Sequence, residues 1–191
     1  KPNLIYAHWV MPQALIALIC FKLTRVPFVF TSHAHDAEIL TKLPVIGKLL
    51  LNKLGFKLTR AQAKVTKEIL LDLEKPSPML RLLQGDVGSG KTIVAAFAAI
   101  RAIEQDCQVA LLAPTELLAE QHFDNFCDRF ARWPIKIEEI SRFKSKKQQY
   151  ESLQRLHEGK IDIIIGTHRL LQPDVKFKDL GLVVIDEEHR F

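Results

Sequence analysis

Short apolar runs rich in Val, Ile and Leu alternate with longer segments of helical periodicity along this chain of 191 residues. Such alternation is typical of a parallel sheet whose crossover connections are helices. Strands buried on both faces read as continuous apolar runs, so Ile161–Gly166 and Gly181–Asp186 are expected near the middle of the sheet. The pattern predicts a three-layer, doubly wound α/β fold with a mainly parallel sheet of about seven strands. The predicted strands are Asn3–His8, Pro27–Ser32, Leu80–Gln84, Gln108–Ala113, Ile135–Ile140, Ile161–Gly166 and Gly181–Asp186.

Helices are predicted between these strands from their periodicity and from residues suited to their ends. Thr59 can cap the helix that follows it, and Gly159 stands directly after the end of another. Residues 36–56 are interrupted by proline and glycine, and they read as one or two short helices with a connector. The predicted helices are Pro12–Thr24, Thr59–Glu74, Gly90–Glu104, Glu116–Ala131 and Ser145–Glu158.

The composition excludes several classes of protein. With 48% hydrophobic and 26% charged residues, the chain is neither disordered nor of low complexity. The longest apolar run, Ala14–Phe21, is far shorter than the roughly 20 residues of a membrane span. Cys20, Cys107 and Cys127 show no metal-ligand spacing, so a reduced, cytoplasmic protein is expected. The net charge of +5 resides in residues 1–58, because residues 59–191 carry 20 basic and 20 acidic side chains.

A glycine-rich loop follows a predicted strand and opens a predicted helix, in the pattern G-x-x-x-x-G-K-[ST]. Its glycines let several backbone N–H groups face one point, and the helix N-terminus adds a positive partial charge. Lys91 is placed to reach the β- and γ-phosphates of a nucleotide, and Thr92 is placed to bind Mg²⁺. A plain strand-to-helix turn is the alternative. The loop comprises Gly85, Asp86, Val87, Gly88, Ser89, Gly90, Lys91 and Thr92.

A second acidic element ends the last predicted strand. Asp186 would hold Mg²⁺, a hard cation that prefers oxygen ligands. Glu187, one residue further on, is placed to orient and deprotonate the water that attacks the γ-phosphate. A solvated strand end is the alternative. Together the two elements predict a Mg-ATP site with Lys91 and Glu187 as its catalytic residues.

Several stretches repeat the serial motifs of one enzyme group over residues 56–191. They are Leu58-Thr59 with Gln62, then RLLQGDVGSGKT, APTELLAEQH, SRF, GTHRLLQ, DVKFKDLG and DEEHRF. In these motifs the chain resembles the first motor lobe of superfamily 2 DNA translocases, the RecG and Mfd group. The resemblance implies a RecA-like P-loop fold, with Mg-ATP as the cofactor and DNA as a partner.

The resemblance also implies roles for particular residues. Gln62 would read the adenine, and His189 would couple the nucleotide state to DNA. Backbone phosphates would be contacted without sequence preference. For Arg142 and the lysines at 144, 146 and 147, a solvated basic loop is an equal alternative. The residues in DNA-contacting motifs are Thr115, Gln121, Ser141, Arg142, Thr167, His168 and Arg169.

The first 52 residues carry a different resemblance. The stretches LIYAHW and VPFVFTSH are similar to a strand-helix-strand piece of GT-B glycosyltransferases, in which His33 would match a histidine near the sugar-transfer cleft. The donor-binding domain of that family has no counterpart in these residues, so glycosyl transfer is not expected. His33, His35 and Asp36 could be read as metal ligands, although an ordinary loop is the plainer interpretation.

We therefore expect a recombined or designed chimera that forms one α/β domain, with a segment over residues 1–55 supplying two strands to a helicase-like segment over residues 56–191. The motors of this group use arginines of a second lobe, so the chain alone is expected to bind Mg-ATP with weak or no hydrolysis and no helicase activity. A folded chimera without activity is the first alternative, and a sugar-nucleotide-binding module the second. We expect a monomer with weak, non-specific DNA affinity and no membrane contact; dimerisation through exposed sheet edges is the alternative.

Overall fold

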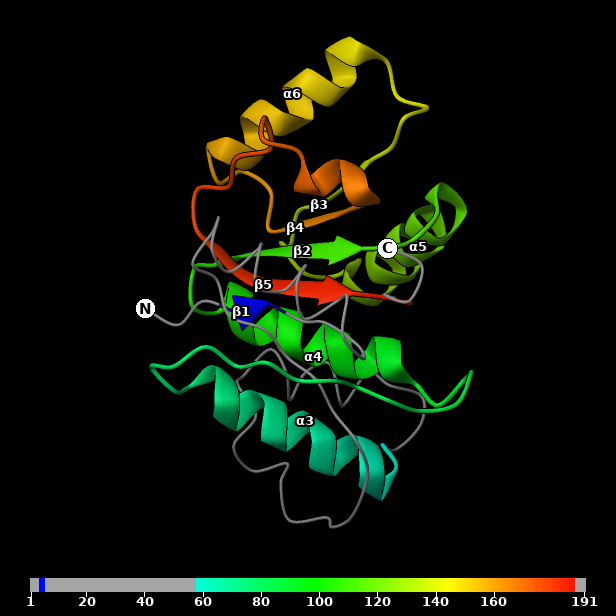
Figure 1. Ribbon diagram of the computed structural model, residues 1–191, viewed down its shortest axis with the longest axis vertical. Helices are drawn as coiled ribbons and strands as arrows, with labels where there is room; N and C mark the ends of the chain where they lie inside the picture. The colour runs from blue at the N-terminus through cyan, green and yellow to red at the C-terminus, as the bar shows by residue number, and fades with distance from the viewer. Residues whose placement is uncertain (1–3, 6–57, 188–191) are drawn as a thin grey trace.

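The computed structural model describes residues 4–5 and 58–187. Four helices and one short 3₁₀ helix separate the strands (Figure 1). The helices are α3 (Arg60–Leu73), α4 (Lys91–Ile103), α5 (Glu116–Phe130), α6 (Lys146–His157) and the 3₁₀ helix η2 (His168–Leu171). The strands are β1 (Leu4–Ile5), β2 (Gln108–Leu112), β3 (Ile137–Ile140), β4 (Ile163–Gly166) and β5 (Leu180–Ile185).

The strands form one sheet in the order β1-β5-β2-β4-β3, and each pair is parallel. Strands β4 and β5 each have a neighbour on both sides, as their continuous apolar sequences predicted. Along β2 the register pairs Val109 with Ile163 on one side and with Leu182 on the other. The predicted parallel α/β sheet is confirmed.

Helices cover both faces of the sheet. On one face, α3, α4 and α5 pack over a core that includes Phe97, Phe126 and Val184. On the other face, α6 and η2 pack over a smaller core that includes Leu156 and Ile185. Figure 1 shows α4 and α3 on one side of the strands and α6 on the opposite side. Because successive strand residues point to opposite faces, adjacent residues of β5 belong to the two different cores.

Local sequence determines where two of the helices begin. Thr59 caps α3 and Ser145 caps α6, and in each case the residue three positions further on is a glutamine. The glutamine side chain accepts a hydrogen bond from the cap residue's N–H, which completes a capping box. Each of the four helices begins and ends within one residue of its predicted bounds, whereas η2 was not predicted.

The expectation of seven strands is wrong for the described chain, in which four strands of four to six residues are joined only by the two-residue β1. Predicted strand Leu80–Gln84 is reduced to a single bridge residue, Leu83. Leu4 and Ile5, inside the predicted strand Asn3–His8, pair with Leu182 and Val183 on the side of β5 opposite β2. Predicted strand Pro27–Ser32 and helix Pro12–Thr24 lie outside the described residues.

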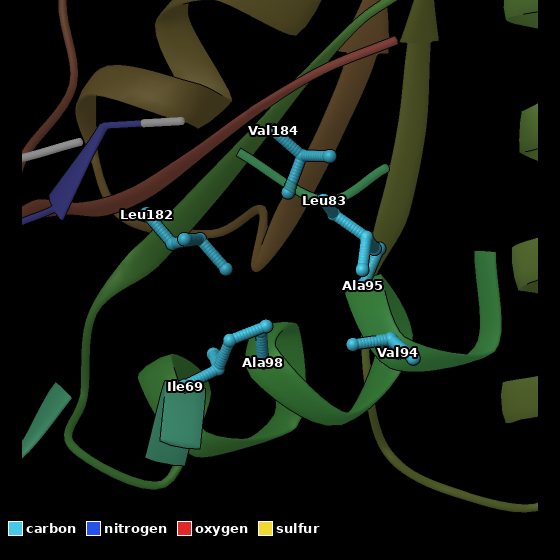
Figure 2. Close-up of a pocket in the computed structure, with 7 residues that line it drawn as sticks. All are labelled: Ile69, Leu83, Val94, Ala95, Ala98, Leu182 and Val184. Carbon is cyan, nitrogen blue, oxygen red and sulfur yellow. The ribbon is translucent and has the colours of Figure 1, made fainter. Parts of the chain in front are cut away.

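A small apolar cavity of about 10 Å³ lies in the core beside Leu83, β5 and the helices α3 and α4. Figure 2 shows its lining, with Leu182 and Val184 of β5 facing Ile69 of α3 and residues of α4. Its small volume and apolar walls suit neither a ligand nor an ordered water.

No helix in the described part of the chain is both long and apolar enough to cross a membrane. This part contains two cysteines, of which Cys107 is buried and Cys127 is partly buried.

Candidate nucleotide site

The predicted site residues gather at one edge of the sheet. Thr115, Ser141, Thr167 and Asp186 each follow the carboxyl end of a different strand. Ligands of open α/β sheets bind beyond the carboxyl ends of the strands, because the connecting loops meet there. The topology therefore brings residues that are far apart in sequence to a common edge.

The glycine-rich loop has the backbone conformation that its sequence requires. Gly88 and Gly90 have φ angles of 79° and 83°, in the left-handed region that glycine adopts without strain. Gly90 is also the N-cap of α4, so the loop leads directly into the helix N-terminus. Lys91 Nζ donates hydrogen bonds to the carbonyl oxygens of Gly85 at 2.7 Å and Asp86 at 2.9 Å. The lysine thus folds back on its own loop, and phosphate binding would require its ammonium group to exchange these carbonyls for phosphate oxygens.

Gln62 ties the start of α3 to the glycine-rich loop. Its Oε1 accepts a hydrogen bond from Thr59 N at 2.9 Å, and its Nε2 donates one to Ser89 O at 2.7 Å. A Cβ atom built on Gly90 would collide with this amide group, so the glycine also permits the close approach of the side chain. Both polar ends of the amide are engaged, and reading an adenine would require Gln62 to exchange at least one of these partners.

Asp186 follows β5 and meets a partner from α5. Its Oδ2 lies 2.7 Å from His122 Nε2. Burial raises the pKa of Asp186, but the hydrogen bond with His122, the backbone N–H of Glu187 and the charge of Lys91 hold this pKa below its ordinary value. The side chain is therefore ionised at neutral pH, which suits a carboxylate that binds a divalent cation.

A cleft of about 570 Å³ joins these elements, a volume within the range of ligand pockets in proteins. Lys91, Thr92, His122, Asp186 and Glu187 line it together with the loop glycines. In the described chain no three His, Cys, Asp or Glu side chains are placed to hold a metal ion by themselves. Mg²⁺ usually takes only one or two protein carboxylates and completes its shell with water and phosphate oxygens, so Asp186 and Thr92 stay the residues expected to hold it.

Glu187 has a φ angle of 47°, in the left-handed region that side-chain-bearing residues rarely adopt. Strained backbone of this kind concentrates at functional sites. Glu187 lines the cleft, and its expected role beside an attacking water stays a prediction.

The residues predicted to contact DNA differ in accessibility. Ser141 and Thr167 are buried, and the Thr167 hydroxyl lies 3.3 Å from Glu116 Oε1. Arg169 makes a paired contact with both carboxylate oxygens of Asp174, at 2.8 and 2.6 Å. The remaining four are exposed, and one of them, Thr115, is the N-cap of α5: Thr115, Gln121, Arg142 and His168.

Sequence reasoning missed two residues of the cleft, His122 and Arg129, both on α5. A signal was present, because His122 stands three residues after buried Ala119 and four before buried Phe126. That spacing places the imidazole on the inward face of the helix. Arg129 lies directly before buried Phe130 near the end of α5. Its Nε is buried without a hydrogen-bond partner in the described chain.

A parallel sheet, a glycine-rich loop that opens a helix, and a carboxylate at the end of an inner strand define the P-loop class of α/β domains. Comparison with known proteins specifies this class further. The chain belongs to the DEAD/DEAH box helicase family, which it matches over residues 59–191.

Relatives within this family are identical to this chain at about half of the aligned positions. The chain is 56% identical to the transcription-repair-coupling factor of Escherichia coli over 144 residues, which is 75% of this chain and 12% of that protein. It is 49% identical to the ATP-dependent DNA helicase RecG of Bacillus subtilis over 141 residues, which is 74% of this chain and 21% of that protein. The predicted resemblance to RecG and Mfd is confirmed.

Solved structures agree with this assignment. A RecG chain bound to a three-way DNA junction superposes with a TM-score of 0.73 at 42% identity, covering 76% of this chain and 20% of that one. The UvsW helicase of bacteriophage T4 shares the fold with a TM-score of 0.52 at 20% identity, covering 92% of this chain and 60% of that one. The chain thus spans about a fifth or less of the transcription-repair-coupling factor and RecG proteins.

Some predictions lie outside the described residues. These are the role of His189, the glycosyltransferase-like segment, and the alternative metal ligands His33, His35 and Asp36. They stay predictions.

Proposed function

We propose that the chain is a nucleotide-binding lobe that takes Mg-ATP into the cleft between the glycine-rich loop and Asp186. The observation that carries the proposal is the presence of Lys91, Thr92 and ionised Asp186 on the walls of one cleft. Lys91 would hold the β- and γ-phosphates, while Thr92 and Asp186 would hold Mg²⁺. Glu187 would orient the attacking water, and Gln62 would read the adenine.

Hydrolysis by these residues alone is expected to be slow or absent. An arginine finger contributes about 10³ to 10⁵ to the rate of phosphoryl transfer, and in the related motors the resemblance assigns it to a second lobe. Arg129 is the one arginine among the described residues that line the cleft, and it lies two helical turns beyond His122. The proposal therefore assigns ATP binding to this lobe, without helicase activity of its own.

We further propose weak, salt-sensitive DNA binding at the same edge of the sheet. A relative, RecG, has been solved on a three-way DNA junction. Exposed hydroxyl, amide and guanidinium groups at this edge are able to bind phosphate oxygens without reading the sequence. Residues 1–55 and 56–191 are proposed to form a single α/β domain, to which Leu4 and Ile5 contribute a short strand beside β5.

Isothermal titration calorimetry with Mg-ATP tests the nucleotide site. The wild-type chain should release or take up heat in a saturable titration, and Lys91→Ala and Asp186→Ala should each abolish it. Lys176→Ala is the matched control, because it removes an exposed lysine outside the cleft and should leave binding unchanged. Equal affinity in the wild-type and Lys91→Ala chains would contradict the proposal.

A folded domain without nucleotide binding is the second candidate, and the two hydrogen bonds from Lys91 to its own loop favour it. A ligand that binds only the native state raises thermal stability by mass action. Under this alternative, saturating Mg-ATP would leave the melting temperature of the wild-type chain unchanged. The chain would then keep the motif in sequence without its activity, as expected of a recombined chimera.

A further inference from the structure

Arg129 carries the one guanidinium group among the described residues that line the nucleotide cleft. It stands seven positions after His122 on α5, close to two full turns, so both side chains share one face of the helix. Its Cα lies about 10 Å further along the helix axis than that of His122, which contacts Asp186. Arg129 therefore reaches the cleft from a helical position well removed from the proposed Mg²⁺ carboxylate.

The guanidinium group of Arg129 lacks the acceptor that a buried donor needs. Its Nε is buried and has no hydrogen-bond partner in the described chain. The residues three and four positions away in sequence, where a helical ion pair would form, are not acidic. Asp128 is the neighbouring acid, but adjacent residues of a helix point in different directions. An unsatisfied buried N–H is costly, so such a group indicates a place where an acceptor from outside the chain can bind.

The other side chains of this part of the cleft are apolar. They come from β2, β5, α4 and the segment before the glycine-rich loop, and most belong to the core that α5 also covers. Figure 2 shows three of them, Leu83, Ala95 and Val184, around the small cavity that they line as well. Burial of a hydrocarbon body against such walls is favourable, whereas burial of a further polar group is not. This part, here called the Arg129 pocket, is lined by Leu83, Ile93, Ala95, Leu111, Arg129 and Val184.

We propose that the Arg129 pocket binds an organic carboxylate, whose charged group accepts hydrogen bonds from Arg129 while a short aliphatic or aromatic body lies on the apolar walls. The Nε–H and one Nη–H of a guanidinium point in parallel, and this fork matches the two oxygens of a carboxylate. Ligand pockets commonly combine apolar walls with a few polar groups that fix the orientation of the ligand. A neutral molecule would leave Nε without its acceptor, and a bare inorganic anion would leave the apolar walls uncovered.

Three small molecules test the two halves of this ligand on the wild-type chain, by calorimetry in the absence of nucleotide. The probe is 3-phenylpropionate, which has both a carboxylate and an apolar body. Its amide, 3-phenylpropanamide, keeps the shape without the charge, and acetate keeps the charge without the ring. We expect 3-phenylpropionate to bind at least about tenfold more tightly than either. Equal affinity for the acid and its amide, or for the acid and acetate, would overturn the proposal.

Substitution at position 129 identifies the group that receives the carboxylate. Arg129→Met keeps an unbranched apolar stem without the charge, and it should weaken binding of 3-phenylpropionate by about 10- to 150-fold, as expected for hydrogen bonds to a charged group. Arg129→Lys keeps the charge without the fork and should give an intermediate affinity. Arg132→Met is the matched control, because Arg132 is an exposed arginine outside the cleft lining, and it should bind like the wild type. Wild-type affinity in Arg129→Met would overturn the proposal, since the carboxylate would then bind elsewhere.

The carboxylate site and the Mg-ATP site fail separately in these measurements. Binding of 3-phenylpropionate that is lost in Arg129→Met supports the Arg129 pocket even if the chain binds no Mg-ATP. If the wild-type chain shows no saturable binding of 3-phenylpropionate at millimolar concentration, the proposal is overturned whatever the result with Mg-ATP. Loss of Mg-ATP affinity in Arg129→Met together with that result would show that the guanidinium serves the nucleotide phosphates instead. The comparison of the three probes needs no variant, so a substitution that prevents folding leaves the proposal testable.

Discussion

Replacement of Gln62 should expose how strongly the start of α3 is tied to the glycine-rich loop. The side chain makes two hydrogen bonds of different purpose, one from Thr59 N within the capping box and one to Ser89 O across 27 positions of sequence. Gln62→Ala removes both. Gln62→Glu keeps an acceptor for Thr59 N but loses the donor to Ser89 O. The pair of variants therefore separates the helix cap from the contact with the loop.

The magnitude follows from the number of bonds lost. A hydrogen bond contributes a net of about 0.5–1.5 kcal/mol to stability, and the lower half applies here because both bonds are exposed. We expect Gln62→Ala to lower the free energy of unfolding by about 1–2 kcal/mol. Gln62→Glu should lose about half as much, because the carboxylate still accepts from the cap residue.

Equilibrium unfolding in urea, followed by circular dichroism, gives these free energies. Thr59→Ala and the double variant Thr59→Ala/Gln62→Ala complete a double-mutant cycle, in which the shared capping box should appear as an interaction energy above about 0.5 kcal/mol. If Gln62→Ala unfolds within about 0.3 kcal/mol of the wild type, the bond to the loop is too weak to stabilise it. Strict additivity in the cycle would refute the coupling between the two side chains.

Three further predictions concern single contacts elsewhere. His122→Ala removes the partner of Asp186 and should raise the Mg²⁺ concentration needed for ATP binding by about 10- to 100-fold in a Mg²⁺ titration. His122→Asn should rescue part of this loss, and an unchanged titration would contradict the positioning role. Gln108→Leu should lower the free energy of unfolding in urea by about 2–4 kcal/mol, because the buried Gln108 side chain donates to two backbone carbonyls and accepts from two backbone N–H groups. A decrease below about 0.5 kcal/mol would refute this prediction. Burial raises the pKa of Asp72, but Lys75 and Arg81 hold this pKa below its ordinary 3.8, so the ionised carboxylate stabilises the fold above pH 3.8 and loses this effect as the pH falls through the lowered pKa. The difference in unfolding free energy between the wild type and Asp72→Asn should therefore shrink in acid. A difference that does not depend on pH would contradict this prediction.

The helices could be predicted more accurately than the strands, because their determinants are local. The capping boxes at Thr59 and Ser145 involve residues only three positions apart, so the sequence shows them directly. A strand, by contrast, forms only where a neighbouring strand pairs with it. The segment Leu80–Gln84 has strand composition, yet only Leu83 forms a bridge, because a strand also needs a partner from elsewhere in the chain. Leu4 and Ile5, inside the predicted strand Asn3–His8, do find such a partner in β5.

In the candidate nucleotide site, too, the local features could be predicted from the sequence and the non-local ones could not. The glycine-rich loop and Asp186 were found from sequence, because their motif lies in one stretch and their chemistry depends on residue type. The buried positions of Ser141 and Thr167 were not, since their burial depends on how loops from separate strands pack. The contact between His122 and Asp186 joins residues 64 positions apart and becomes evident only in three dimensions.

Helix α5 connects the two halves of the proposed site. At its first turn Glu116 Oε1 lies 3.3 Å from the hydroxyl of Thr167, in the loop after β4, while its Oε2 is buried without a hydrogen-bond partner in the described chain. About 9 Å further along the same helix, His122 contacts Asp186. One helix therefore makes both contacts, with Thr167 at its first turn and with Asp186 further along, so α5 links the loop after β4 to the nucleotide cleft after β5.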